Sequence, residues 1–100
     1  MGFFNFMGGG SDTNAIKDYL NKGAVILDVR TPAEWAEGHT KGAKLITLND
    51  IPNSVNKIKA WDKAIIIVCR SGGRAGTALD YLKNANIDAI NGGAWQNANT

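Results

Sequence analysis

The single cysteine of this 100-residue chain lies in a short segment that also holds two arginines and two adjacent glycines. The segment runs through Cys69, Arg70, Ser71, Gly72, Gly73 and Arg74. An apolar run precedes it and a helical pattern follows it, which predicts a tight loop between a strand and a helix N-terminus. Backbone N–H groups at such a point have no carbonyl partners, so the loop is predicted to attract a negative charge.

The chemistry that this loop favours is nucleophilic attack by sulfur. N–H donors and nearby positive charge stabilise a thiolate, and we expect Cys69 to ionise more readily than free cysteine. Gly72 and Gly73 are expected to supply permissive backbone dihedrals and to keep side chains away from the amides. Arg70 and Arg74 add two positive charges that can hold an oxyanion. A cysteine at the end of a strand would on its own favour a buried structural role. The residues that follow Cys69, from Arg70 to Arg74, instead favour a reactive thiol that binds an anion.

Strands alternate with helices around this loop. Apolar runs predict strands at residues 24–29, 45–48, 64–69 and 88–90. Apolar spacing and capping residues predict helices from Ser11 or Thr13 to Gly23, from Thr31 to Gly38, around 51–58, and from Gly73 to Asn84 or Asn86, with a turn at 91–93. The alternation predicts an α/β fold with a parallel sheet covered on both faces, whose ligands collect at the carboxyl ends of the strands.

Length and composition exclude several classes of function. A chain that is 44% hydrophobic and 20% charged is typical of one globular domain. A net charge of +2, with dispersed lysines and arginines, does not favour a nucleic-acid or membrane-surface partner. One cysteine excludes an internal disulfide, and with one histidine it leaves no Cys/His set for zinc. We expect a cytoplasmic protein with neither a metal nor an organic cofactor.

Residues 1–10, MGFFNFMGGG, are predicted to form an apolar, glycine-rich arm ahead of a domain at 11–100. The arm has no Lys or Arg before its apolar part and is too short for a secretory signal. Phe6 stands where a myristoylation signal needs Ser or Thr. The longest apolar run, Ala64–Cys69, is far shorter than the ~20 residues that span a membrane. Stable membrane insertion is therefore not expected, and an edge strand or a loosely packed arm is favoured.

Several short motifs occur in order along most of the chain. Cys69, Gly72 and Arg74 match a C-x-x-G-x-R loop pattern. Further motifs between residues 24 and 95 are Asp28-Val29-Arg30, Glu34 with Gly38-His39, Gly42-Ala43 and Gly92-Gly93. In these motifs the chain resembles the rhodanese-like sulfurtransferases. The resemblance implies a three-layer α/β/α fold with a central, mostly parallel sheet of four or five strands, and an activity of the thiosulfate sulfurtransferase type.

The resemblance also implies a reaction and its residues. Cys69 would take the outer sulfur of a small anionic donor such as thiosulfate, release sulfite, and pass the sulfur from a persulfide to an acceptor. The acceptor would be a thiol of a small molecule or a carrier protein, with cyanide serving in assays. The substrate-binding residues would be those of the loop: Arg70, Ser71, Gly72, Gly73 and Arg74. We expect Arg74 to organise the loop and Arg70 to point outward and attract the anionic donor.

Two other functions remain open on the sequence. Cysteine phosphatases and arsenate reductases place five residues between Cys and Arg, whereas Cys69 and Arg74 enclose four. No Asp identifiable from the sequence offers the general acid that a phosphate ester requires. The other alternative is a persulfide carrier or redox-sensing module with little turnover of free thiosulfate, for which Phe3, Phe4 and Phe6 would form a docking element.

A carboxylate and an arginine end the first predicted strand. Asp28 and Arg30 should lie at the same sheet edge as Cys69. We expect them to support the site by holding loops together, because a buried carboxylate accepts backbone or guanidinium hydrogen bonds. Arg30 is also expected to form a local pair with Glu34.

Three further residues draw attention near the loop. His39 is the only histidine, and a structural role is favoured over activation of the cysteine, because a thiolate held by N–H donors needs no base. Thr40 stands where the family usually has a branched apolar residue, which predicts weaker local packing. Of the three tryptophans, Trp95 is the best candidate for a contact near the pocket.

Overall fold

A computed structural model describes residues 13–99, so the expected arm at 1–10 lies outside the described residues. A four-stranded parallel sheet has the order β2-β1-β3-β4. Its strands are β1 (Val25–Asp28), β2 (Lys44–Leu45), β3 (Ile65–Cys69) and β4 (Ala89–Ala94). The helices are α1 (Thr13–Asn21), α2 (Pro32–Glu37), α3 (Ile51–Ala60) and α4 (Gly73–Asn84), with short 3₁₀ helices η2 (Leu48–Asp50) and η3 (Trp95–Ala98).

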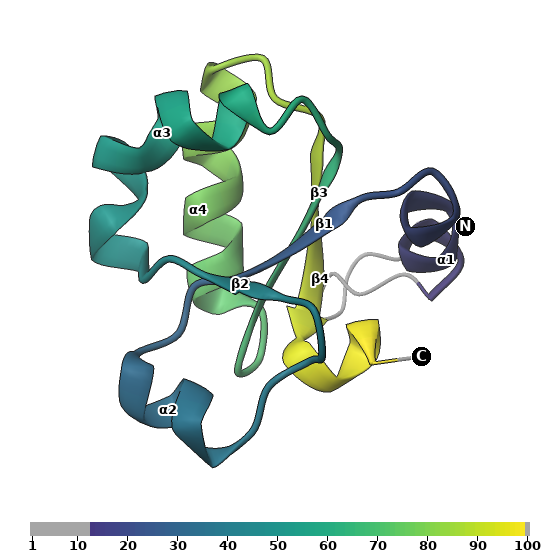
Figure 1. The fold of residues 1–100 in the computed structure, drawn as a ribbon, viewed down its shortest axis with the longest axis vertical. Coiled ribbons are helices and arrows are strands. Elements are labelled where there is room, and N and C mark those ends of the chain that lie inside the picture. Colours follow the sequence, from purple (N-terminus) through teal and green to yellow (C-terminus); the bar gives the residue numbers. More distant parts are fainter. Residues whose placement is uncertain (1–12, 100) are drawn as a thin grey trace.

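Helices cover both faces of the sheet, as Figure 1 shows. On one face α3 and α4 pack over alternate side chains of β3, those of Ile65, Ile67 and Cys69. On the other face α1 and η3 pack over Ile66 and Val68. All five residues of β3 are buried, which explains the continuous apolar run of this strand. The predicted three-layer α/β/α fold with a parallel sheet is confirmed.

The predicted strand at 45–48 is wrong at its carboxyl half. Strand β2 contains only Lys44 and Leu45 before the chain enters η2. Two backbone bonds to the end of β1 and the residue after it follow, from Ile46 N–H to Asp28 O and from Leu48 N–H to Val29 O. The Thr47 hydroxyl then donates to Asp50 Oδ2 across η2. This local hydrogen bond favours a turn, so the apolar run packs as a curved segment rather than as a strand.

The predicted turn at 91–93 is also wrong, because these residues belong to β4. The pairing with β3 shifts by one residue: Ile67 lies opposite Asn91, and Val68 lies opposite Gly93. Gly92 is therefore the extra residue of a β-bulge. A Cβ at Gly92 would lie 2.8 Å from Ile66 Cγ2, so only glycine fits there. Gly92 therefore indicates a bulge where β4 passes close to Ile66, and not a reversal of the chain.

The capping box of α2 forms as predicted. The Glu34 N–H donates to Thr31 Oγ1, and the Thr31 N–H donates to Glu34 Oε1. The helix directly follows β1, and it therefore lies beside the carboxyl ends of the strands (Figure 1). None of the helices within residues 13–99 is long and apolar enough to cross a membrane.

Candidate functional site

The carboxyl ends of the strands bring Cys69 into a backbone cradle. Cys69 is the last residue of β3, and its side chain turns into the loop that follows. Its Sγ accepts hydrogen bonds from the N–H groups of Gly72, at 3.0 Å, and of Ala75, at 3.4 Å. The residue is only 1% exposed. Two N–H donors thus converge on a buried sulfur at the start of α4.

The Ala75 amide is a donor that the sequence prediction did not include. The predicted cradle consisted of the amides of residues 70–74, whereas Ala75 lies within the first turn of α4. The first N–H groups of a helix have no carbonyl partner inside the helix and are free to bind an anion. The sulfur therefore lies at the N-terminus of α4, where the helix dipole also favours negative charge.

The two adjacent glycines of the loop have different roles. Gly72 is the N-terminal cap of α4 and adopts φ 104°, a left-handed conformation that strains other residues. Gly73 is the first residue of α4 and does not have a positive φ. A Cβ at Gly73 would meet nothing within 4 Å. The expectation that both glycines supply special dihedrals thus holds for Gly72 and is wrong for Gly73.

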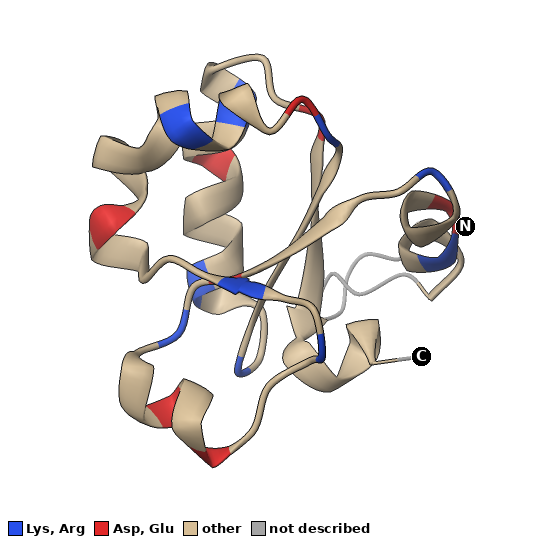
Figure 2. Ribbon diagram, viewed as in Figure 1, with Lys and Arg blue, Asp and Glu red and all other residues tan. Residues whose placement is uncertain are grey.

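An ion pair ties the loop to α2. Arg74 Nη1 and Nη2 donate to Glu34 Oε1 and Oε2 at 2.7 and 2.9 Å. The hydrogen bonds from Arg74, and then that from the Thr31 N–H, hold the pKa of the Glu34 carboxyl well below its usual range. The Glu34 carboxylate in turn raises the pKa of Arg74. Both groups are therefore charged at neutral pH, and Figure 2 shows the acidic α2 beside the basic loop.

The expected local pair between Arg30 and Glu34 is wrong. Arg30 instead pairs with Asp28, with Nε donating to Oδ1 at 2.9 Å and Nη2 to Oδ2 at 2.7 Å. It reaches α2 only through the carbonyl oxygens of Glu34, at 3.3 Å, and Gly38, at 2.8 Å. Both partners of the pair are buried, and Asp28 takes the cation that lies two residues further along the chain. The pair thus connects the end of β1 to the middle of α2 and to its C-terminal cap.

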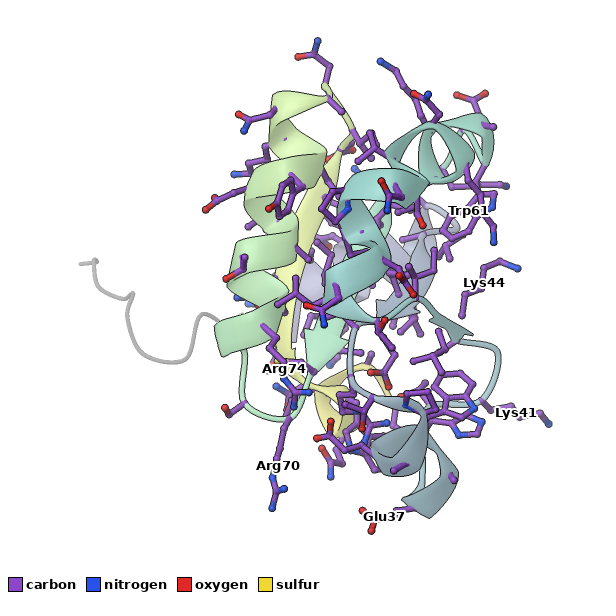
Figure 3. All side chains as sticks on the ribbon, turned by 90° about the vertical axis from the view of Figure 1, so that its left-hand side faces the viewer. Glu37, Lys41, Lys44, Trp61, Arg70 and Arg74 are labelled. Atoms are coloured by element: carbon purple, nitrogen blue, oxygen red, sulfur yellow. The ribbon has the colours of Figure 1, made fainter. Side chains whose placement is uncertain are left out.

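A cavity of about 240 Å³ opens beside the loop. Its lining residues come from the chain after β1, from α2 and its cap, from the loop and from η3: Arg30, Glu34, Glu37, Gly38, Arg70, Trp95 and Gln96. The Arg30 guanidinium lies over the Trp95 ring, 5.0 Å from its centroid. Arg70 is exposed and points away from the body of the molecule, at the same end as Glu37 (Figure 3). The structure therefore places both Trp95 and Arg70 at a pocket near the cysteine.

The remaining residues considered from the sequence lie around this pocket. Ser71 is exposed on the loop. The His39 ring stacks on Trp35 with centroids 3.6 Å apart, and its Nδ1 hydrogen-bonds to Trp35 O. Thr40 is buried and donates from Oγ1 to Trp95 O at 2.9 Å. Thr40 thus connects the chain after α2 to η3, where weaker packing was expected.

Two residues at the site were missed by sequence reasoning. Glu34 was expected to pair with Arg30, whereas its carboxylate binds Arg74. Asn91 was assigned to a turn, whereas its Nδ2 donates to Gly72 O at 2.9 Å. An amide before two glycines is the only signal of Asn91 in the sequence. Among residues 13–99, no cluster of three or more His, Cys, Asp or Glu side chains is arranged to hold a metal ion.

Comparisons with known proteins point to one family. The family model of the rhodanese-like domain matches residues 12–97. The putative sulfurtransferase YtwF of Bacillus subtilis is 32% identical over 90 residues, which are 84% of this chain and 86% of YtwF. The crystal structure of a rhodanese-like domain protein from Staphylococcus aureus superposes with a TM-score of 0.72 and 34% identity, covering 88% of this chain and 87% of that one.

A further relative is named for its substrate. The thiosulfate sulfurtransferase GlpE of Stutzerimonas stutzeri is 30% identical over 70 residues, which are 70% of this chain and 63% of GlpE. The chain thus spans less than two thirds of that relative, and it spans 53% of a sulfurtransferase of Allochromatium vinosum. The family model covers the segment that carries the loop and its supporting residues.

Proposed function

Because the chain belongs to the rhodanese-like family of sulfurtransferases, we propose that it is a thiosulfate sulfurtransferase that works through a persulfide on Cys69. The observation that carries this proposal is the convergence of the Gly72 and Ala75 N–H groups on the Cys69 sulfur. Donors that stabilise a thiolate produce a nucleophile without a neighbouring base. The same donors would stabilise a negatively charged persulfide after transfer.

The first step is attack of the Cys69 thiolate on the outer sulfur of thiosulfate. A new S–S bond forms between Cys69 and that sulfur, and the bond between the two sulfurs of thiosulfate breaks. Sulfite leaves with the electron pair of the broken bond. The loop is left with a Cys69 persulfide that carries one negative charge, as the thiolate did before it.

The second step is attack of an acceptor thiolate on the outer sulfur of the persulfide. The Cys69 thiolate leaves with the electron pair of the bond that breaks, and the acceptor carries the sulfur away as its own persulfide. The acceptor is a thiol of a small molecule or of a carrier protein, and cyanide would replace it in an assay. Both steps exchange sulfur without a metal or an organic cofactor. A reducing compartment such as the cytoplasm fits this chemistry, because Cys69 must remain unoxidised.

The size of the loop supports sulfur transfer over phosphate chemistry. Four residues separate Cys69 from Arg74, and the Arg74 guanidinium is engaged by Glu34. Arg74 is therefore not directed at an oxyanion above the sulfur, as a phosphatase mechanism would need. A loop with four residues between Cys and Arg also encloses less room for a tetrahedral phosphate than the five-residue loop of the cysteine phosphatases.

Arg70 is proposed to steer the anionic donor to the loop. It is exposed, it lines the cavity beside the loop, and it is not used in any contact that builds the cradle. A positive charge in this position raises the rate at which an anion arrives, and salt screens that effect. We expect Arg70→Ala to lower kcat/KM for thiosulfate and to remove much of its dependence on ionic strength. An unchanged salt dependence in this variant would contradict the steering role.

Steady-state turnover tests the proposed activity. The purified protein, given thiosulfate and cyanide, should release thiocyanate and sulfite in equal amounts, and a dithiol should replace cyanide as acceptor. Cys69→Ser should fold like the parent and show no transfer. An aryl phosphate should not be hydrolysed. Hydrolysis of that ester, or transfer by the Cys69→Ser protein, would overturn the assignment.

A further inference from the structure

The bulge of β4 contacts the loop that holds the sulfur. Asn91 lies on β4 just before the bulge residue Gly92, and its Nδ2 donates to Gly72 O at 2.9 Å. The Gly72 N–H is the shorter of the two donors to Cys69 Sγ. We propose that Asn91 is a positioning residue that holds the Gly72 N–H on the sulfur and thereby sets the reactivity of Cys69. The inference deepens the proposed function, on which its role in sulfur transfer rests.

The backbone of Gly72 links the two contacts. Its carbonyl accepts from Asn91 Nδ2 and from the Gly76 N–H, each at 2.9 Å. Its φ of 104° and ψ of −13° relate the peptide that carries this carbonyl to the peptide that carries the N–H. A carbonyl held from two sides therefore fixes the direction of the N–H. Without Asn91 only the helical bond from Gly76 remains, and glycine has access to many other dihedrals.

The bulge gives the Asn91 amide its orientation. The Gly93 N–H donates to Asn91 Oδ1 at 2.8 Å, so the oxygen faces the strand and Nδ2 faces the loop. Gly76 of α4 faces this amide, and a Cβ at that position would lie at ordinary contact distance from Nδ2, 3.5 Å away. Gly92 allows the bulge, because any side chain there would overlap Ile66. The amide is thus held at both ends, as is required of a group that positions another.

A purely structural role for Asn91 makes a different prediction. In that case Asn91 would only stabilise the bulge, by accepting a hydrogen bond from the Gly93 N–H. Its hydrogen bond to Gly72 O would have no effect on the sulfur. Asn91→Asp separates the two roles. Aspartate keeps an acceptor for the Gly93 N–H at nearly the same volume, but it has no donor for Gly72 O. Asn91→Ala removes both bonds without adding a charge.

Asn97 offers a matched control. Its Nδ2 also donates to a backbone carbonyl of the bulge, that of Gly92, at 3.0 Å. This carbonyl lies on β4 and not in the loop, so Asn97→Ala removes a similar bond without touching Gly72. Each variant is first checked for a cooperative urea transition, so that rates are compared between folded proteins.

The experiment is the rate of alkylation of Cys69 by iodoacetamide at neutral pH. Cys69 is the only cysteine, so all alkylation is assigned to it. We expect both Asn91 variants to react about five-fold more slowly, the effect of one typical hydrogen bond, and Asn97→Ala to react like the parent. Wild-type rates in Asn91→Asp or in Asn91→Ala, or an equal loss in Asn97→Ala, would overturn the inference.

Alkylation requires neither a sulfur donor nor an acceptor. A parent protein that fails to transfer sulfur would therefore contradict the proposed function and leave the alkylation result intact. Conversely, active transfer with unchanged alkylation in either Asn91 variant would contradict the positioning role alone. In active protein, the Asn91 variants should lower kcat more than they raise KM for thiosulfate, because Asn91 does not line the cavity beside the loop.

Discussion

The two ends of the sheet use the same kinds of side chains in different surroundings. At the carboxyl end, the Asp28 and Arg30 side chains are 0% and 5% exposed. At the amino end, Lys22 of the chain after α1 pairs with Asp88 before β4, and these side chains are 51% and 57% exposed. Tyr19 of α1 also donates to Asp88 Oδ1. Both ends join a carboxylate to a cation, but only one does so out of contact with water.

The difference shows where the fold and the site depend on each other. Contacts at the amino end hold one short helix against the sheet. Contacts at the carboxyl end connect β1 and α2, and the Glu34–Arg74 pair adds the loop that surrounds the sulfur. A change at the carboxyl end should therefore affect stability and reactivity together. A change at the amino end should affect stability alone, and only slightly.

The largest effect is expected from the buried carboxylate. Asp28→Ala leaves the Arg30 guanidinium buried without its partner, which costs roughly 3–5 kcal/mol of unfolding free energy. Asp88→Ala at the amino end should cost at most about 1 kcal/mol, since Asp88 and Lys22 are both exposed. Urea denaturation of both variants measures the contrast. Equal losses at the two ends would contradict it.

The two loop glycines provide the next contrast. Gly72→Ala forces a Cβ onto a backbone at φ 104° and should cost on the order of 1–2 kcal/mol, while displacing an N–H donor from the sulfur. Gly73→Ala occupies the first turn of α4, meets no neighbour, and should leave stability unchanged or raised by about 0.5 kcal/mol. Thermal or urea unfolding of the pair distinguishes them. Equal destabilisation by both substitutions would show that the left-handed conformation is not what requires glycine.

The link between α2 and the loop should matter more for rate than for folding. Glu34→Gln removes the charge that holds Arg74, and we expect kcat/KM for thiosulfate to fall roughly five-fold. The lowered pKa of Glu34 means that its stabilising contribution is present above the unfolded-state value of about 4.3 and is lost as the pH falls below it. Acid unfolding of the parent and the variant should therefore converge at low pH. If the Glu34→Gln variant unfolds at the same pH as the parent and keeps full activity, the Glu34–Arg74 ion pair does not support the loop.

The smallest effect is expected at the amino end. Tyr19→Phe removes the hydroxyl that donates to Asp88 and should cost about 0.5 kcal/mol near neutral pH. The contact with Asp88 raises the pKa of Tyr19 to about 12 and lowers the pKa of Asp88. Its contribution is therefore fully present below about pH 10, is lost as the pH rises toward 12, and is also lost in acid below about pH 4.

Tyr81→Phe is the matched control for Tyr19→Phe, because Tyr81 is an exposed tyrosine on α4. It should leave the pH dependence of unfolding unchanged. Tyr19→Phe should flatten the alkaline part of that dependence. The same alkaline profile in the Tyr19 variant and the parent would show that this contact does not contribute to folding.

The parts of the fold that local patterns determine were predictable. The apolar run of β3, the capping box of α2 and the helical spacing in α4 each depend on residues close together in the sequence. The order of motifs also placed the cysteine at the carboxyl edge of a parallel sheet. These features follow from backbone geometry and from which side chains must leave water.

The tertiary contacts of the site were not predictable in this way. Arg74 binds Glu34 forty residues away, while the nearer Arg30 takes Asp28 instead. The sequence offers several arginines and several carboxylates that could form ion pairs. Which of them pair is decided by the packing of α2 against the loop. The bulge at Gly92 likewise depends on Ile66 in the neighbouring strand, so a glycine pair resembled a turn. The contact of Asn91 with Gly72 follows from that bulge.

Intact mass spectrometry after thiosulfate treatment tests the central claim most directly. The chain has one thiol, so any sulfur taken up by a cysteine must lie on Cys69. The account predicts that the protein gains the mass of one sulfur atom, that a dithiol removes it, and that Cys69→Ser gains nothing. An unchanged mass in the parent protein, or the same gain in Cys69→Ser, would contradict the account.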